Sequence, residues 1–180
     1  VGTAGQMEFV EHALNVLDKE KNGRVVAIVQ MSCATKNESD LFAVKDRLLA
    51  KHHLKAVISM PDDLFYPVGV VTCIMIFEAN KPNKGRKTWF GYFKDDGFEK
   101  RKYIGRIDAK DKYTNLKRRL LSAYFNLEEI PGLSVRHEVC AADEWCAEAY
   151  METDYSTLLA SDFDKKIREY CAFKLLTNLE

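Results

Sequence analysis

The sequence lacks the short motifs that mark most catalytic loops. Its nine glycines form neither a GxGxxG fingerprint nor a P-loop, so no phosphate-holding loop is recognisable. A GxSxG elbow, a short-range Ser/His/Asp pattern, a CxxC pair and an HExxH motif are also missing. The adjacent His52 and His53 would face different ways on a helix, which disfavours a shared metal. We therefore expect no metal site and no catalytic constellation of a common type.

Long apolar runs are missing too. No stretch reaches the roughly 18–20 residues that span a bilayer, and the N-terminus has no signal-peptide pattern. The five cysteines are odd in number and widely spaced, which suits reduced thiols. These features predict a cytoplasmic protein without a membrane partner. The start at Val1 instead of Met suggests a piece of a longer protein.

The net charge of zero hides an uneven distribution. Residues 1–80 carry 8 basic and 10 acidic residues, residues 81–119 carry 14 and 5, and residues 120–180 carry 5 and 12. Because the middle segment alone is strongly basic, the zero sum does not argue against a nucleic-acid partner.

The hydrophobic pattern predicts an α/β fold. A chain of 180 residues with 47% hydrophobic residues has enough apolar surface for one compact core. Helical spacing predicts helices over 6–20 and 40–52, the second capped by Asp40, with a loop at 31–39 before it. An uninterrupted apolar run at 25–29 predicts a strand covered on both faces, and Leu54, Ala56, Val57 and Ile58 give a second signal of a buried strand. This alternation indicates a parallel sheet with helices packed against it.

A third apolar run, at 70–77, breaks this pattern. Residues 62–69 are too few for a parallel crossover, so we expect this strand to be antiparallel. An aromatic strand follows at 89–93. Helices are predicted over 115–124, capped by Asn115, over 143–151, and over 162–175, capped by Asp162.

Three stretches carry a resemblance to a known family: GRVVAIVQMSCAT, HHLKAVISMPDDLFYPVGVVTCIMIFEANKP and KTWFGYFKDDGFEKRK. In order and spacing they resemble the later half of the catalytic domain of N6-adenine DNA methyltransferases. They resemble in particular the methylation subunits of type I restriction-modification systems and their fused relatives. The match covers about residues 6–105, and beyond it only ADEWCAEAYMETDYS is loosely similar.

The resemblance implies a partial Rossmann-like methyltransferase sheet. It would have parallel strands plus an antiparallel hairpin strand, flanking helices and a C-terminal helical extension. Residues 1–95 would form the later half of the methyltransferase domain, and residues 96–180 a basic linker and a mainly helical extension.

Two parts of the family pattern are missing. These are the glycine loop that binds S-adenosylmethionine and the Asn/Asp-Pro-Pro-Tyr/Phe motif that holds the target adenine. The exocyclic amine of adenine is a poor nucleophile until an Asn or Asp side chain and a carbonyl accept its hydrogens, with the methyl donor in line. The resemblance therefore implies S-adenosylmethionine as cofactor of the parent enzyme, and a chain that holds no catalytic residue, does not bind the cofactor and is inactive alone. The implied partners are double-stranded DNA and specificity and restriction subunits or domains.

The resemblance also places Phe65 in a loop that approaches the flipped base, where its ring would stack on the adenine. The alternative is that Phe65 packs over the end of the sheet. Thr72 matches a threonine whose hydroxyl would bond the turn of Gly69. Asp62 and Asp63 lie at the carboxyl end of a strand, where open sheets bind ligands, although stabilisation of the turn is the simpler role.

A basic stretch with interleaved tyrosines is the second candidate site. Its side chains would contact DNA phosphates: Lys100, Arg101, Lys102, Arg106, Lys117, Arg118 and Arg119, with Lys110 and Lys112 beside them. The alternative is a solvated face that pairs with the acidic residues of 138–169.

Other interpretations stay open at this point. The aromatic strand 89–93 is either a stacking platform for single strands or a strand packed on the core, and Trp145 belongs to a core or to a partner surface. The whole chain could instead be a non-catalytic, methyltransferase-like interaction module that binds a protein partner. A small-molecule or RNA methyltransferase with the same later strands is a third hypothesis.

Overall fold

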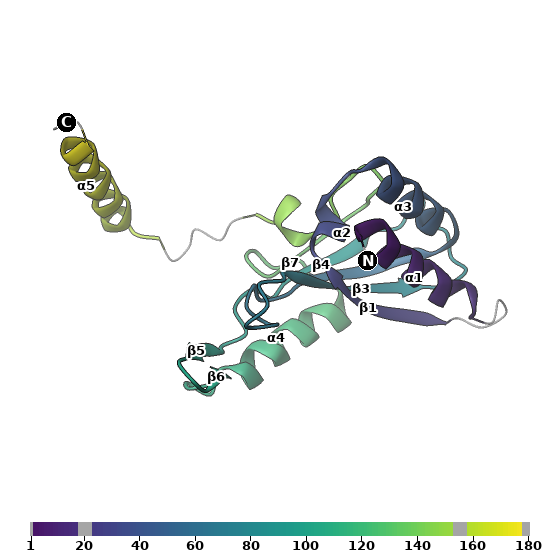
Figure 1. Ribbon diagram of the computed structural model, residues 1–180, viewed down its shortest axis with the longest axis horizontal. Coiled ribbons are helices and arrows are strands. Elements are labelled where there is room, and N and C mark those ends of the chain that lie inside the picture. Colours follow the sequence, from purple (N-terminus) through teal and green to yellow (C-terminus); the bar gives the residue numbers. More distant parts are fainter. Residues whose placement is uncertain (1, 18–22, 153–157, 178–180) are drawn as a thin grey trace.

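The computed structural model describes residues 2–17, 23–152 and 158–177. The elements (Figure 1) are α1 (Thr3–Asn15), β1 (Arg24–Gln30), α2 (Ser32–Thr35), α3 (Ser39–Lys51), β2 (His53–Ser59), β3 (Thr72–Glu78), β4 (Thr88–Tyr92), β5 (Glu99–Arg101), β6 (Gly105–Ile107), α4 (Tyr113–Asn126), β7 (Ser134–His137), the 3-10 turn η1 (Ala147–Ala149) and α5 (Ala160–Thr177).

Five strands form a mixed sheet in the order β1-β3-β2-β4-β7. The third strand, β3, runs antiparallel to both β1 and β2, which confirms the expectation from the short connection before it. β4 is parallel to β2, and β7 is antiparallel to β4. The predicted α/β class with parallel strands, an antiparallel strand and flanking helices is confirmed.

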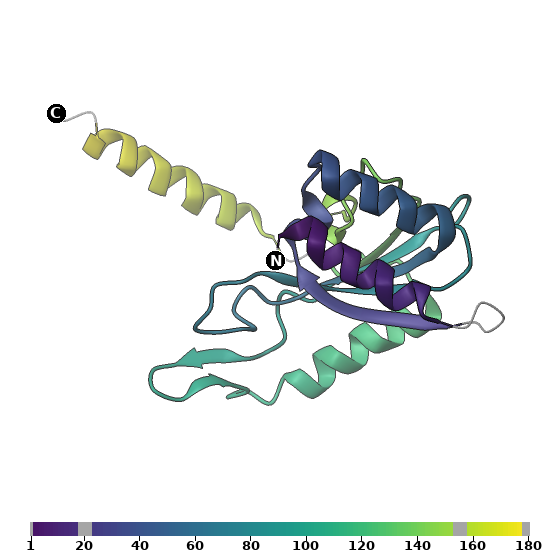
Figure 2. The same cartoon turned by 45° about the vertical axis from the view of Figure 1, so that its right-hand side comes forward.

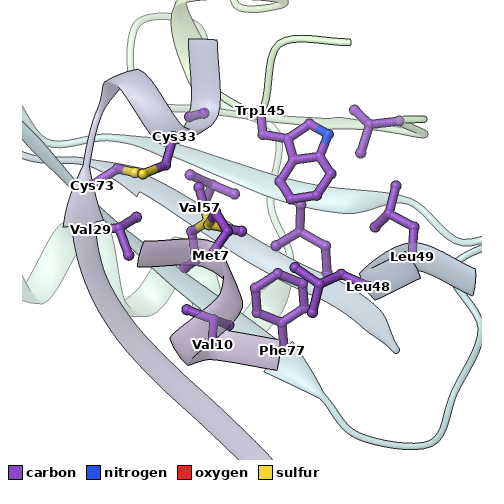
Figure 3. Close-up of a cluster of buried hydrophobic side chains, with 14 of the residues drawn as sticks. Met7, Val10, Val29, Cys33, Leu48, Leu49, Val57, Cys73, Phe77 and Trp145 are labelled. Atoms are coloured by element: carbon purple, nitrogen blue, oxygen red, sulfur yellow. The ribbon is translucent and has the colours of Figure 1, made fainter. Parts of the chain in front are cut away.

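Helices α1 and α3 cover one face of the sheet (Figure 2). Their apolar residues recur at helical spacing, with Met7, Val10 and Leu14 of α1 buried. They meet Phe77 and Trp145 in the larger core (Figure 3). Helix α4 covers the other face, where a smaller core is formed by residues including Trp89, Leu120 and Ala123.

Strand β1 differs from the prediction. It lies at the edge of the sheet, and Val26 and Ile28 are 64% and 59% exposed. Both point to the α4 side, since they pair with Ile76 and Ile74 of β3, but α4 packs farther along the sheet. The prediction that β1 is covered on both faces is therefore wrong for the described part of the chain. Helices cover only its Val25, Ala27 and Val29 side.

The predicted helix over 143–151 is also wrong, because that segment is irregular apart from the turn η1. Trp145 and Ala147 are buried in the larger core, so the extended backbone is fixed by tertiary contacts. The domain boundary at residue 95 stays a prediction, but packing continues across it, because β7 joins the main sheet and Trp145 joins its core. The predicted loop 31–39 contains the short helix α2.

The residues at the N-terminal ends of three helices differ from the caps that the sequence predicted. Helix α4 begins at Tyr113, and the Asp108 carboxylate accepts the N–H groups of Lys112 and Tyr113 at 2.8 and 3.0 Å, so Asn115 is not the cap. Asp40 lies inside the first turn of α3, not at its cap. Asp162 is not the cap either, because α5 begins at Ala160 and Asp162 lies in its first turn, where its carboxylate accepts the Leu159 N–H at 2.9 Å.

Helix α5 has no buried residue. Its exposed side chains include Phe163, Ile167 and Tyr170, which recur along one stripe. No helix of the described ranges is both long and apolar enough to cross a membrane.

Candidate functional site

A hollow of about 530 Å³ opens at the carboxyl ends of β1 and β2. This is where open α/β sheets place their ligands, and the volume is typical of small-molecule sites. The strand ends and the loop after β2 line it through Gln6, Ile28, Val29, Gln30, Leu64, Phe65, Tyr66, Val68, Val70 and Thr72.

Phe65 and Tyr66 form the aromatic part of the lining. They are 44% and 59% exposed, because turns after Pro61 lift this loop off the sheet: the Leu64 N–H bonds the Pro61 carbonyl and the Tyr66 N–H bonds that of Asp63. Phe65 therefore does not pack in the core over the sheet end, and its ring is accessible to a ligand in the hollow.

The polar groups of the hollow are few and uncharged. The Gln6 Oε1 atom accepts the Gln30 N–H at 3.1 Å, which fixes α1 to the end of β1. Thr72 is 5% exposed, and its hydroxyl has no hydrogen-bond partner among the described residues. The predicted bond from this hydroxyl to the turn of Gly69 is thus not formed.

The lining does not fit S-adenosylmethionine. That molecule carries an ammonium, a carboxylate and two ribose hydroxyls, which need charged or closely placed polar partners. The hollow has no charged side chain in its lining, and its faces are mainly aliphatic and aromatic. A flat, largely apolar group such as a nucleobase suits it better.

A line of polar contacts runs from the sheet to the loop that carries Phe65. Ser59, at the end of β2, donates to Glu148 at 2.6 Å, and Glu148 lies 3.8 Å from Lys94. Lys94 in turn contacts Asp62 at 2.6 Å. Asp62 thus ties the loop to the end of β4, a structural role that differs from the predicted stabilisation of its own turn.

Asp63 connects the same loop to the β5–β6 hairpin. Its carboxylate lies 3.1 Å from Arg106 Nε and 3.7 Å from Lys100 Nζ. The Arg106 guanidinium also donates to both oxygens of the buried Asp96 at 2.8 and 2.9 Å. The hairpin and the Phe65 loop are therefore held together by one arginine between two carboxylates.

The basic candidates fall into two groups. Arg106 is committed to Asp63 and Asp96, whereas the other side chains are exposed: Lys100, Arg101 and Lys102 on the hairpin, and Lys117, Arg118 and Arg119 on α4. Lys110 and Lys112 are exposed as well, and Lys110 pairs with Glu99. Among the described acidic residues of 138–169, only Glu148 forms an ion pair with a basic residue of 81–119, and that residue is Lys94. Asp154 lies outside the described residues.

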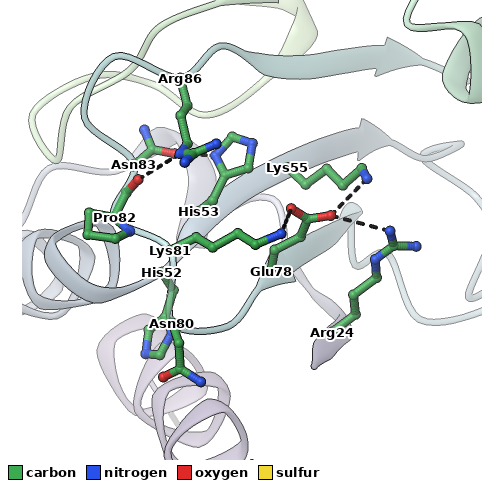
Figure 4. Close-up of polar contacts among 10 residues, drawn as sticks. All are labelled: Arg24, His52, His53, Lys55, Glu78, Asn80, Lys81, Pro82, Asn83 and Arg86. Carbon is green, nitrogen blue, oxygen red and sulfur yellow. Dashed lines mark hydrogen bonds and ion pairs between the residues drawn. The ribbon is translucent and has the colours of Figure 1, made fainter. Parts of the chain in front are cut away.

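The opposite end of the sheet is closed by structural polar contacts (Figure 4). His53 Nδ1 lies 2.8 Å from Asn83 Oδ1, and His52 Nδ1 accepts the Asn80 N–H at 3.1 Å. Burial lowers the pKa of both histidines. No cluster of metal-ligating side chains occurs in the ranges that the structure describes.

The aromatic strand has a structural role. β4 lies inside the sheet between β2 and β7, and Trp89, Phe90 and Phe93 are buried. They are core residues and not a stacking platform. The sequence did not predict the β5–β6 hairpin, because its short strands are rich in charged residues and show no alternation of apolar and polar side chains. The one signal present was Gly105, which follows the turn and has a φ of +93°.

Comparisons with known proteins agree with this geometry. A family model described as N-6 DNA Methylase matches residues 2–175. The type II restriction enzyme and methyltransferase RM.BcgI of Heyndrickxia coagulans is 33% identical over 174 residues, which is 94% of this chain and 26% of that protein. The chain thus spans about a quarter of the length of this curated relative.

Solved structures share the fold. The type I restriction-modification methyltransferase subunit from Streptococcus thermophilus has a TM-score of 0.59 at 19% identity, over 73% of this chain and 26% of that one. A modification subunit of a putative type I restriction enzyme from Vibrio vulnificus has a TM-score of 0.60 at 12% identity, over 84% and 33%.

Proposed function

Because this chain belongs to the N-6 DNA methylase family, we propose that it is the later part of a restriction-modification enzyme that methylates N6 of adenine in double-stranded DNA. S-adenosylmethionine is the proposed methyl donor of the whole enzyme, bound outside this chain. The chain alone lacks the cofactor loop and the adenine-holding motif, so it is inactive in isolation. The enzyme works in the cytoplasm.

The observation that carries this proposal is the bare edge of β1. A strand of the composition VVAIV is typical of the interior of a parallel sheet, yet one side of it has no strand among the described residues, and Val26 and Ile28 are exposed. A groove along α1 and β1, of about 340 Å³, continues this surface. We infer that the remainder of the enzyme adds the next strand here and covers Val26 and Ile28.

That addition would complete the hollow beside it. Ile28, Val29 and Gln30 belong both to the edge strand and to the lining, so the added part would lie next to Phe65. Phe65 would then stack on the flipped adenine while the added part supplies the groups that activate the amine.

Phosphate contacts are assigned to the exposed basic side chains: Lys100, Arg101, Lys102, Lys117, Arg118 and Arg119. Arg106 has a structural role instead, since it holds the hairpin against the Phe65 loop. Specificity and restriction subunits or domains are the proposed protein partners, and the apolar stripe of α5 supports such a contact.

Methylation assays test the proposal. Incorporation of labelled methyl groups from S-adenosylmethionine into duplex DNA is measured for the 180-residue chain and for the complete product of its gene. We expect N6-methyladenine with the complete product and none with the chain alone. Turnover by the chain alone would contradict the proposal that the cofactor and the adenine-holding motif lie outside it. A complete product that methylates no adenine would favour the alternative of a non-catalytic interaction module.

A further inference from the structure

The tip of the β5–β6 hairpin presents two large apolar side chains to solvent. Tyr103 is 93% exposed and Ile104 is 70% exposed, and neither belongs to a core cluster. They are adjacent at the turn, where the Ile104 N–H bonds the Arg101 carbonyl at 3.2 Å. Because neither side chain contributes to a core cluster, we interpret the exposed pair as a binding surface.

The base of the hairpin is firmly held although its tip is bare. Arg106 in β6 donates to both carboxylate oxygens of Asp96, which is 5% exposed, and also pairs with Asp63. The Arg106 guanidinium lies 5.2 Å from the centre of the Phe98 ring. A two-stranded ribbon anchored in this way projects its tip in a defined direction beside the loop of residues 61–71 (Figure 2).

Positive charge surrounds the tip. Lys100 and Arg101 are exposed on β5 and Lys102 is exposed in the turn, where its Nζ lies 5.0 Å from the centre of the Tyr103 ring. Glu99, the acidic residue of this strand, is already paired with Arg101 at 3.4 Å and with Lys110. The partner that this surface fits is a polyanion with apolar flat groups, and duplex DNA has both.

We propose that Tyr103 and Ile104 form a wedge that enters a groove of the duplex beside the target adenine. Tyr103 contacts the bases there, while Lys100, Arg101 and Lys102 contact the phosphates at the sides of the groove. Two-stranded ribbons bind in either groove of DNA, and apolar wedges that enter from the minor groove unstack base steps and kink the duplex. This inference rests on the proposed function, because it takes DNA as the substrate.

Contacts between the hairpin and the loop of Phe65 connect the wedge to the proposed site of the flipped adenine. Lys100 Nζ lies 5.3 Å from the centre of the Tyr66 ring, and Asp63 joins the two elements through Arg106. Insertion of the tip into the groove would therefore place the loop of Phe65 at a fixed distance along the same duplex. Unstacking by Tyr103 would lower the cost of extruding the neighbouring adenine toward the hollow.

Fluorescence of the full 180-residue chain tests the wedge. A Tyr103→Trp variant places an indole at the tip, and the two native tryptophans, Trp89 and Trp145, are fully buried. We expect the added emission to be quenched when a 30-base-pair duplex is titrated in at low salt, because the ring stacks on bases. The matched control is Phe9→Trp, since Phe9 is 67% exposed on α1, which covers the face of the sheet opposite to α4, and its emission should not change.

Affinity and its salt dependence separate the wedge from the charges. The double change Tyr103→Ser with Ile104→Ser should weaken duplex binding about tenfold, which corresponds to one lost stacking contact, without altering the slope of log affinity against log salt. Lys102→Gln should instead reduce that slope by about one phosphate contact.

Two results would distinguish failure of the wedge from failure of the proposed function. If the unaltered chain binds duplex but the double variant binds equally well and the Tyr103→Trp emission stays unquenched, the wedge is wrong and the DNA surface stands. If the unaltered chain shows no salt-dependent duplex binding, the proposed DNA surface is itself wrong and the wedge falls with it.

Discussion

The ammonium group of Lys45 lies 4.5 Å from the centre of the Trp145 ring, in the interior of the protein. Lys45 is fully buried, and its Nζ donates to the carbonyl oxygens of Asp143 at 2.8 Å and Ala34 at 3.4 Å. A lysine of α3 thus holds the irregular segment around Trp145 against the main core. Burial lowers the pKa of Lys45 to about 8.

This pKa predicts a rise in stability with pH. Between about pH 8 and pH 10.5 the unfolded chain keeps a proton that the folded chain has lost, so the free energy of unfolding increases by up to about 3 kcal/mol. We expect this rise in the difference between the urea-unfolding free energies of the native chain and Lys45→Met. The difference is the measurement, because the buried thiols and Tyr150, whose pKa values burial raises, lower the stability of both proteins equally as the pH rises. Equal pH profiles would contradict the assignment.

The ion pairs of Glu78 predict how the free energy of unfolding changes in acid. Burial opposes ionisation of its carboxyl group, but Lys55 at 2.9 Å and Lys81 at 3.2 Å donate to it and lower its pKa to about 2, and Arg24 lies 3.3 Å away. The stabilisation is present above pH 4.5 and is lost as the pH falls toward 2. Glu78→Gln should therefore cost about 2 kcal/mol of unfolding free energy at pH 7, and the two proteins should converge near pH 2.

The control for this prediction is Glu38→Gln. Glu38 pairs with Lys36 at 2.8 Å, but both side chains are more than half exposed. Such a pair contributes less than about 1 kcal/mol, so this variant should match the native chain at both pH values. A Glu78→Gln variant that behaves like Glu38→Gln would show that the three cations do not stabilise the carboxylate.

The sequence predicted those parts of the fold that depend on local pattern. The antiparallel β3 followed from a connection too short for a crossover, and α1 and α3 followed from helical spacing. The helix expected at 143–151 failed because long-range contacts decide that segment. Trp145 donates to the Ala34 carbonyl through its backbone N–H at 3.0 Å, and Lys45 fixes the Asp143 carbonyl.

The candidate site was only partly predictable. The family resemblance pointed to Phe65, whose stacking role stays a prediction. Nothing in the sequence pointed to the role of Arg106, because a basic run does not reveal which of its members faces a carboxylate. Asp63 and Asp96 lie far from each other in sequence and meet only at that guanidinium. The exposed side of β1 could not be predicted either, since an apolar run shows that a strand needs cover and not which element provides it.

Phe65→Ala should lower methylation by the complete enzyme. Loss of one stacking face on the flipped adenine is expected to reduce kcat/KM roughly tenfold to a hundredfold. Because Phe65 is 44% exposed, the thermal stability should hardly change. Phe42→Ala on α3 is the matched control, with a ring that is 41% exposed and does not line the hollow, and it should leave kcat/KM unaltered. Equal losses in both variants would contradict the stacking role.

Arg106→Gln should loosen the hairpin. The change leaves the Asp96 carboxylate buried without its cation, and it releases Asp63 in the Phe65 loop. We expect amide hydrogen exchange over residues 99–107 to become at least roughly tenfold faster, which corresponds to a local loss of more than about 1.4 kcal/mol. Arg101→Gln, at an exposed position in the same hairpin, should leave exchange nearly unchanged. Unchanged exchange in Arg106→Gln would show that the hairpin is held by other contacts.

Ile28→Asp tests the bare edge of β1. Ile28 is 59% exposed, so a carboxylate there should change the stability of the 180-residue chain by less than about 1 kcal/mol. In the complete enzyme the same side chain would be covered, and burial of an unpaired carboxylate should destabilise the assembly by several kcal/mol and abolish methylation.

The matched control for Ile28→Asp is Val16→Asp, because Val16 is 68% exposed at the end of α1 and does not lie on the uncovered face of the sheet. That variant should leave both the chain and the complete enzyme intact. If Ile28→Asp were tolerated equally well in the complete enzyme, Val26 and Ile28 would not be covered there. The continuous apolar sequence of β1 would then need another explanation, since neither the sheet nor the rest of the enzyme would use that side of the strand.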